Sequence, residues 1–265
     1  MENQTLIAIL YSLPLLGIVA YISSKPQYSI KASITWMMFI ISYVLSEMAA
    51  IVNGVIDIYT QTYLVSLVLA AFNEEVFKLV MIISFLQYFK KRVTLLQSLC
   101  LGGTCCLAFA AAENWYYIVR DDLDVLPGIQ ALVRVVMPSP MHFITGSIIA
   151  IYSFQYYVKE RNVNNIFIGL GFGSAIHIFY NIGAGSNSGL MSLAVAIGAI
   201  IAFTSYKRFD SEPVIKPSLH SKTRRVSEAK LHEYGSIEEI EEKDSSPKVV
   251  SKKKPETIKI VQKKK

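Results

Sequence analysis

Residues 63–89 read YLVSLVLAAFNEEVFKLVMIISFLQYF, an apolar run with two adjacent carboxylates, Glu74 and Glu75, near its centre and Lys78 one helical turn later. Such a run is long enough to cross a bilayer, which takes about 20 residues of helix. Each charge at the centre of a membrane helix costs about 2.5 to 3.5 kcal/mol, and such residues usually face a polar interior, an ion path or a substrate path. The run therefore predicts a membrane helix with a functional site around its carboxylate pair.

The composition of the whole chain also indicates a protein embedded in lipid. Hydrophobic residues make up 52% of the 265 residues and charged residues 17%, against roughly 25% charged residues in soluble domains. We predict an all-α, polytopic transmembrane helix bundle with about seven spans and a disordered C-terminal tail. The predicted spans are, within a few residues at each end, 5–22, 32–52, 64–89, 95–119, 139–158, 163–182 and 188–206.

Basic residues in the short loops predict the orientation, because the cytosolic loops of membrane proteins are enriched in Lys and Arg. Every odd-numbered loop is basic, whereas the even-numbered loops carry few or balanced charges. We therefore predict that the N-terminus lies on the outer or lumenal side and the C-terminus in the cytosol. The basic residues of the odd loops are Lys25, Lys31, Lys90, Lys91, Arg92, Lys159, Arg161, Lys207 and Arg208.

The composition changes abruptly after residue 206. Residues 207–265 carry 16 Lys and Arg against 10 Asp and Glu, whereas residues 1–206 carry 10 of each. We predict a transmembrane domain at 1–206, with a functional core at about 63–182, and a disordered, basic cytosolic tail at 207–265, which is too polar to form a core. Such a tail is drawn to anionic lipid, unless it is a solvated segment without a specific partner; we expect no nucleic-acid partner.

Small residues inside the spans predict close packing between helices. The spacing Gly169-x-x-x-Gly173 predicts that the sixth span packs tightly against a neighbour. The three cysteines, Cys100, Cys105 and Cys106, all fall in the fourth span, and their spacing is not that of a zinc site. We expect them to be small buried residues.

Polar residues inside the spans recur at a spacing of four. Residues four apart lie on one face of a helix, about 5 to 6 Å apart at Cβ. Each such pair presents a two-residue polar face to one side of its span, and His142 adds a single imidazole in the fifth span. The pairs are Glu74 with Lys78, Glu113 with Tyr117, and His177 with Asn181.

Five ionisable residues are predicted in the outer half of the membrane, where one shared cavity would avoid desolvating each of them separately. Carboxylates and imidazoles in such a cavity can deprotonate a water and protonate a leaving amine, which fits peptide hydrolysis. Two His and one Glu are also a plausible ligand set for Zn²⁺. The same residue types build proton relays, so a cation-coupled carrier stays open. The five residues are Glu74, Glu75, Glu113, His142 and His177.

Four motifs follow one another between about residues 70 and 182. They are NEEVFK at 73–78, FAAAENWYY at 109–117, Arg134 with PMHFITG at 140–146, and SAIHIFYN at 174–181. In this order and at these separations they resemble the motif set of the PrsW family of intramembrane proteases, a branch of the superfamily that includes the CAAX prenyl proteases.

The resemblance implies an intramembrane endopeptidase, of metallo- or glutamate type, that acts on membrane-anchored polypeptides. One glutamate of the Glu74-Glu75 pair would act as general base. His177 would orient the water or stabilise the oxyanion, with Asn181 as a neutral donor. The second motif has Glu113 where CAAX proteases carry a histidine, and His142 would supply that imidazole.

The residues and the resemblance together predict the site. The expected catalytic residues are Glu74, Glu75, His142, His177 and Asn181, and the supporting residues are Lys78, which would anchor its helix, Glu113, Asn114, Tyr117 and Arg134. The candidate metal ligands are Glu113, His142 and His177, with zinc as the candidate metal. The alternatives are a non-catalytic scaffold of the same superfamily, against which the glutamate pair argues, and a proton- or ion-coupled carrier, for which an inverted internal repeat is expected.

Overall fold

The structure is a computed structural model that describes residues 2–89, 93–120, 137–160, 162–186 and 188–211. Most of these residues are helical, and no strand occurs among them. The predicted tail lies almost entirely outside the described residues. The elements are α1 (Glu2–Ser24), α2 (Ala32–Tyr59), α3 (Tyr63–Phe89), α4 (Leu95–Arg120), α6 (Pro138–Phe154), the π-helix η1 (Gln155–Glu160), α7 (Asn164–Ser186) and α8 (Ser188–Ser211).

The α-helices of the described chain correspond one to one with the seven predicted spans, which confirms the all-α membrane architecture. Four of them contain stretches long and apolar enough to cross a membrane. α3 is long enough but holds three ionisable residues near its centre, and α6 has 17 residues that η1 continues. The four stretches are Ala32–Tyr59, Leu95–Tyr116, Asn164–Ala184 and Gly189–Asp210.

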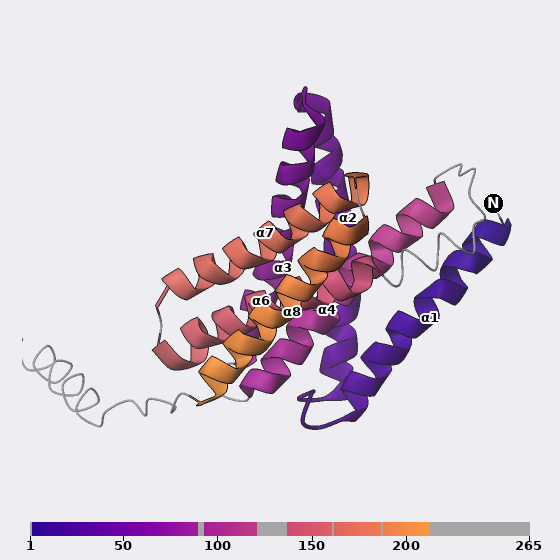
Figure 1. The fold of residues 1–265 in the computed structure, drawn as a ribbon. Coiled ribbons are helices and arrows are strands. Elements are labelled where there is room, and N and C mark those ends of the chain that lie inside the picture. The colour runs from indigo at the N-terminus through magenta and orange to yellow at the C-terminus, as the bar shows by residue number, and fades with distance from the viewer. Residues whose placement is uncertain (1, 90–92, 121–136, 161, 187, 212–265) are drawn as a thin grey trace, which may run out of the picture. The chain divides into compact units, whose positions relative to one another are not determined.

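α2 extends further than predicted, to Tyr59, where the sequence indicated a loop from about residue 53. The predicted loop contains the polar residues Asn53 and Asp57. Both are instead bonded across to α3: Asn53 donates to Glu74, and Asp57 accepts a hydrogen bond from Ser66. α2 and α3 therefore form a long hairpin, whose turn projects beyond the ends of α7 and α8 in Figure 1.

α4 and α6 occupy the centre of the helical domain (Figure 1). α4 packs against α1, α2, α3 and α6, and α6 packs against α3, α4, α7 and α8. The apolar stretch of α4 is 83% buried, whereas that of α8 is 17% buried. Polar side chains on the inward faces of α4 and α6 are therefore held in the interior of the protein.

Glycines allow the central helices to approach closely. A Cβ atom added to Gly102 of α4 would lie 2.5 Å from the carbonyl oxygen of Gly146 in α6, and the reverse distance is also 2.5 Å. A Cβ atom on Gly169 of α7 would lie 2.8 Å from Cβ of Tyr152, and one on Gly173 would lie 3.1 Å from the Ile149 side chain. The close packing predicted for the sixth span is thus present, against α6, and such contacts are typical of membrane helices.

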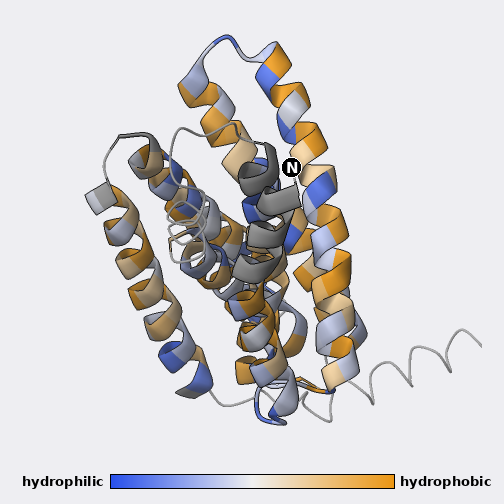
Figure 2. Cartoon of the chain, turned by 90° about the vertical axis from the view of Figure 1, so that its right-hand side faces the viewer, coloured by the Kyte–Doolittle hydropathy of each residue, from blue (hydrophilic) through white to orange (hydrophobic). Residues whose placement is uncertain are grey.

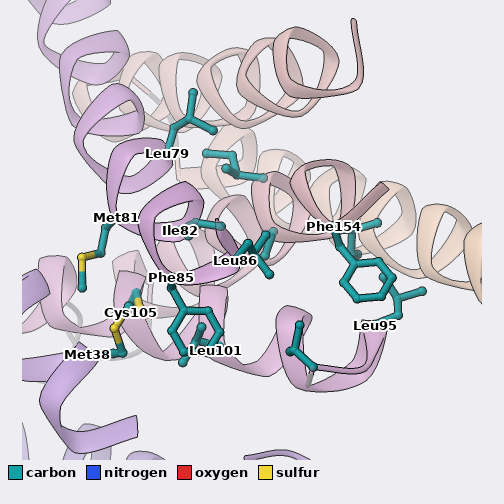
Figure 3. Packing of buried hydrophobic residues seen from close by; sticks show 14 of the residues in the cluster. Met38, Leu79, Met81, Ile82, Phe85, Leu86, Leu95, Leu101, Cys105 and Phe154 are labelled. Carbon is teal, nitrogen blue, oxygen red and sulfur yellow. The ribbon is translucent and has the colours of Figure 1, made fainter. Parts of the chain in front are cut away.

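An apolar cluster fixes the second half of α3. Leu79, Ile82, Phe85 and Leu86 are buried against residues of α4 and α6, including Phe154 (Figure 3). Along α3, these apolar contacts begin directly after Lys78. They hold the helix so that the preceding polar turn, residues 74–78, faces the centre of the bundle. The three cysteines are buried, as predicted.

Large hydrophobic side chains also cover the outer faces of the helices. On α2 and α3 the exposed ones include Ile51, Ile58, Tyr63 and Phe72. Figure 2 shows that hydrophobic residues recur along the length of the helices. A soluble monomer rarely exposes such extended apolar surface, whereas lipid covers it in an integral membrane protein.

Candidate functional site

Six ionisable residues from four helices meet in the interior, and we call them the site cluster. α3 contributes three of them, and α4, α6 and α7 contribute one each. The two histidine rings lie edge to face, with 5.2 Å between their centroids and 75° between their planes. The sequence analysis named all six. They are Glu74, Glu75, Lys78, Glu113, His142 and His177.

Glu75 is the most enclosed carboxylate of the cluster, with no exposed side-chain surface. Its Oε1 atom accepts hydrogen bonds from Lys78 Nζ at 2.5 Å, His177 Nδ1 at 2.7 Å and Thr145 Oγ1 at 3.3 Å. These donors come from α3, α7 and α6, so the one oxygen ties three helices together. A carboxylate held by several donors, two of them on basic side chains, is strongly fixed in place.

Lys78 is also fully buried and connects Glu75 to His142. Its Nζ lies 2.8 Å from His142 Nδ1 and 5.4 Å from the centroid of the Phe109 ring. The sequence analysis placed Lys78 on one face with Glu74. The ion pair is instead with Glu75, because residues three apart on a helix are neighbours as well.

Lys78 determines which nitrogen of His142 carries the proton. An ammonium group has donors only, so Nδ1 of His142 must accept its hydrogen bond. His142 Nε2 then holds the ring proton and donates to Glu113 Oε2 at 2.8 Å. Both ring nitrogens of His142 are therefore engaged.

Glu74 lies at the edge of the cluster, with 18% of its side chain exposed. Its Oε1 atom accepts a hydrogen bond from Asn53 Nδ2 at 3.1 Å, and its Oε2 atom lies 3.9 Å from His177 Nε2. Because His177 donates through Nδ1 to Glu75, its Nε2 presents a lone pair to Glu74. A separation of 3.9 Å is too long for a direct hydrogen bond and suits a bridging water.

The edge of the site cluster at Glu74 also brings together potential metal ligands. Glu74, His142 and His177 each offer one ligand atom, and these atoms lie within 4.8 Å of one another. Two imidazoles and a carboxylate are the ligand set of many catalytic zinc sites. His177 fits this set well, because ligating histidines usually donate their other ring N–H to a carboxylate, as His177 does to Glu75.

His142 is less available as a metal ligand than His177. Binding a metal through Nε2 of His142 would replace its hydrogen bond to Glu113. Glu113 was predicted as a ligand beside the two histidines, whereas the carboxylate with a ligand atom within 4.8 Å of those of both histidines is that of Glu74. Glu113, with 31% of its side chain exposed, contacts His142 instead.

The remaining predicted residues lie around the cluster or outside the described chain. Asn114 follows Glu113 in α4 and is buried. Asn181 lies one turn beyond His177 in α7 and is half-buried; within the described residues no hydrogen bond joins it to the site cluster. Arg134 and the side chain of Tyr117 lie outside what the structure describes.

Three further residues belong to the surroundings of the site, although no role was predicted for them. Two contact the cluster directly, and the third contacts one of these two. Thr145 donates to Glu75, and its position three residues after His142, on the same helix face, was a usable signal. Asn53 donates to Glu74, and Asn73 donates to Asn53 at 2.8 Å. Asn53 was missed because the second span was predicted to end before it.

Comparison with known proteins adds one finding. A family model described as PrsW family intramembrane metalloprotease matches residues 28–206. The matched range contains all four motifs and all six residues of the site cluster. No match was found among curated proteins or among solved structures.

Proposed function

The chain belongs to the PrsW family of intramembrane metalloproteases, and we propose that it hydrolyses peptide bonds of membrane-anchored polypeptides with Glu74 as the group that activates the attacking water. The observation that supports this assignment is the 3.9 Å gap between Glu74 Oε2 and His177 Nε2. Both atoms can accept a proton there, and Glu74 is partly exposed. Glu75, the other candidate base, is fully buried, with its Oε1 atom already bonded to three donors.

The proposed reaction begins with a water held between Glu74 and His177. A water in the gap donates one hydrogen bond to Glu74 Oε2 and the other to His177 Nε2. Glu74 takes a proton as the water oxygen attacks the peptide carbonyl carbon, and the tetrahedral intermediate collapses when that proton passes to the leaving amine. General base catalysis of this kind contributes about 10² to 10⁴ in rate. Asn181 is proposed as a neutral donor to the oxyanion.

Glu75 and Lys78 support the reaction without contacting the substrate. The Glu75 carboxylate holds the proton of His177 on Nδ1, which leaves Nε2 free to accept from the water. Lys78 does the opposite for His142 and keeps its proton on Nε2. The buried pair therefore assigns different proton positions to the two imidazoles, as a buried carboxylate does in other hydrolytic sites.

A metal would be held by Glu74, His142 and His177, with zinc as the proposed ion. Zinc in such a site polarises the carbonyl and acidifies a bound water.

The proposal is tested by comparing membrane proteomes of cells that produce the wild-type protein, Glu74→Gln or Glu47→Gln at equal levels. Glu47 is an exposed glutamate of α2 outside the site cluster and serves as the matched control. We expect a membrane protein that is cut with the wild type and with Glu47→Gln and that accumulates uncut with Glu74→Gln. If no fragment depends on Glu74, and reconstituted vesicles instead show a substrate flux, the carrier alternative replaces the protease.

The orientation and the tail are further proposals that rest on charge. The basic odd-numbered loops support an outer or lumenal N-terminus, a cytosolic C-terminus, and a site that opens to the outer or lumenal side. The basic segment 207–265 is proposed as a disordered tail that contacts anionic lipid. A tag placed after Lys265 is expected to be digested by a protease added to the cytosolic side; protection of the tag would reverse the orientation.

A further inference from the structure

Two asparagines connect the backbone of α2 to the edge of the site cluster. Asn73 of α3 donates through Nδ2 to the carbonyl oxygen of Ala49 at 3.1 Å and to Asn53 Oδ1 at 2.8 Å. Asn53 of α2 donates through Nδ2 to Glu74 Oε1 at 3.1 Å. The chain of contacts therefore runs from a main-chain carbonyl to one oxygen of Glu74.

The direction of this chain is fixed at its far end. A backbone carbonyl can only accept, so Asn73 must turn its NH₂ group toward Ala49. The same NH₂ group faces Asn53, which must therefore present its oxygen to Asn73. Only the NH₂ group of Asn53 is then left for Glu74. The carboxylate is thus offered a neutral donor whose orientation two helices determine together.

We propose that Asn53 and Asn73 form an amide relay that positions Glu74 for catalysis, by holding Oε1 so that Oε2 faces His177. Asn53 is the one hydrogen-bond donor to Glu74 within the described chain, whereas Glu75 has three. Loss of that donor frees the Glu74 side chain to rotate out of line with His177 Nε2. This inference rests on the proposed function, because it takes Glu74 as the group that acts on the water.

An alternative role for the same contacts is simple adhesion between α2 and α3. Hydrogen bonds between membrane helices can serve that purpose without any part in catalysis. The two roles differ in what they change. Adhesion affects the stability of the protein, whereas positioning changes the turnover of bound substrate and makes the two asparagines act as one unit.

The test uses the purified full-length protein and the membrane protein that the proteome comparison identifies as cut. Leucine replaces each asparagine, because Leu is well accepted in membrane helices and has the same branched shape and the same number of side-chain heavy atoms without any hydrogen-bonding group. We expect Asn53→Leu to lower kcat by about 10- to 100-fold, the usual effect of removing a group that orients a site residue, with KM unchanged. Asn73→Leu should have a smaller effect in the same direction.

The double variant distinguishes a relay from two separate contacts. If Asn73 acts through Asn53, then Asn53→Leu/Asn73→Leu has the kcat of Asn53→Leu alone. Asn165→Leu is the matched control, since Asn165 is a buried asparagine at the far end of α7 from His177, and its kcat should equal that of the wild type. Thermal unfolding of each variant measures the adhesive contribution separately.

The outcomes test the amide relay and the proposed function separately. A wild-type kcat in Asn53→Leu, or kcat losses that multiply in the double variant, would overturn the relay while the proposed function stands, provided that Glu74→Gln is inactive. A wild-type kcat in Glu74→Gln would overturn the proposed function, and the catalytic role of the relay with it.

Discussion

Glu74 and Glu75 are neighbours in the chain, yet they occupy two opposite environments. Glu75 belongs to a closed network with Lys78, His142 and Thr145, in which the Glu75 and Lys78 side chains have no exposed surface. Glu74 lies on an open edge, with one hydrogen-bond donor and 3.9 Å between its Oε2 atom and His177 Nε2. Successive helical residues are turned by about 100°, and this turn separates the fixed charge of Glu75 from the carboxylate of Glu74, which we propose acts on the water.

The largest effect is expected from breaking the closed network. Lys78→Met removes one partner of a buried ion pair and leaves the Glu75 charge uncompensated, which costs about 3 to 5 kcal/mol. The free energy of unfolding, measured on the purified protein in detergent, should fall by that amount.

Two comparisons accompany this variant. Lys31→Met removes an exposed lysine, and Glu74→Gln changes a carboxylate on the open edge; each should alter the free energy of unfolding by less than about 1 kcal/mol. Equal losses for Lys78→Met and Lys31→Met would show that the network is not closed as described.

Zinc affinity tests whether the two histidines differ in their availability as metal ligands. His177 Nε2 faces the open edge, whereas both nitrogens of His142 are engaged by Lys78 and Glu113. We expect His142→Ala to weaken zinc binding by at least about 10- to 100-fold, the loss typical of a residue that only supports a ligand, and His177→Ala to weaken it further. Competition with a chelator on the purified protein measures both affinities, and a greater loss for His142→Ala would reverse the assignment.

The smallest effect concerns the weakest donor to Glu75. Thr145→Val keeps the shape of the side chain and removes the 3.3 Å hydrogen bond, which should cost about 0.5 to 1.5 kcal/mol of stability. The cleavage rate should fall by less than about tenfold, because Lys78 and His177 still hold the carboxylate. Thr104→Val is the control, since its hydroxyl is equally buried but bonds only to its own helix; a larger loss at 104 would contradict the role given to Thr145.

The sequence predicted the helices and the residues of the site cluster, because charges inside apolar runs stand out without any knowledge of packing. Spacing could not predict which glutamate would be buried. Glu74 is four residues from Lys78 and Glu75 is three, and both spacings allow an ion pair. The choice depends on the rotation of α3, which its packing against α4 and α6 through Ile82 and Phe85 determines.

The contacts of Asn53 also could not be predicted from the sequence. The second span was predicted to end at about residue 52, so Asn53 was expected in a loop. In the structure Asn53 lies within α2 and contacts Glu74 and Asn73 on the neighbouring helix. Contacts between residues 20 and 21 apart in the chain depend on how the hairpin packs, and the residue pattern along one helix does not contain that information.

The central claim is that the carboxylate on the open edge activates the water. It is tested most directly by reconstituting the purified wild-type, Glu74→Gln and Glu47→Gln proteins in vesicles with the identified substrate and measuring the initial rate of cleavage. We predict that Glu47→Gln cuts at the wild-type rate and that Glu74→Gln, folded to the same extent, is slower by about 10² to 10⁴. Cleavage by Glu74→Gln at the wild-type rate would contradict the account.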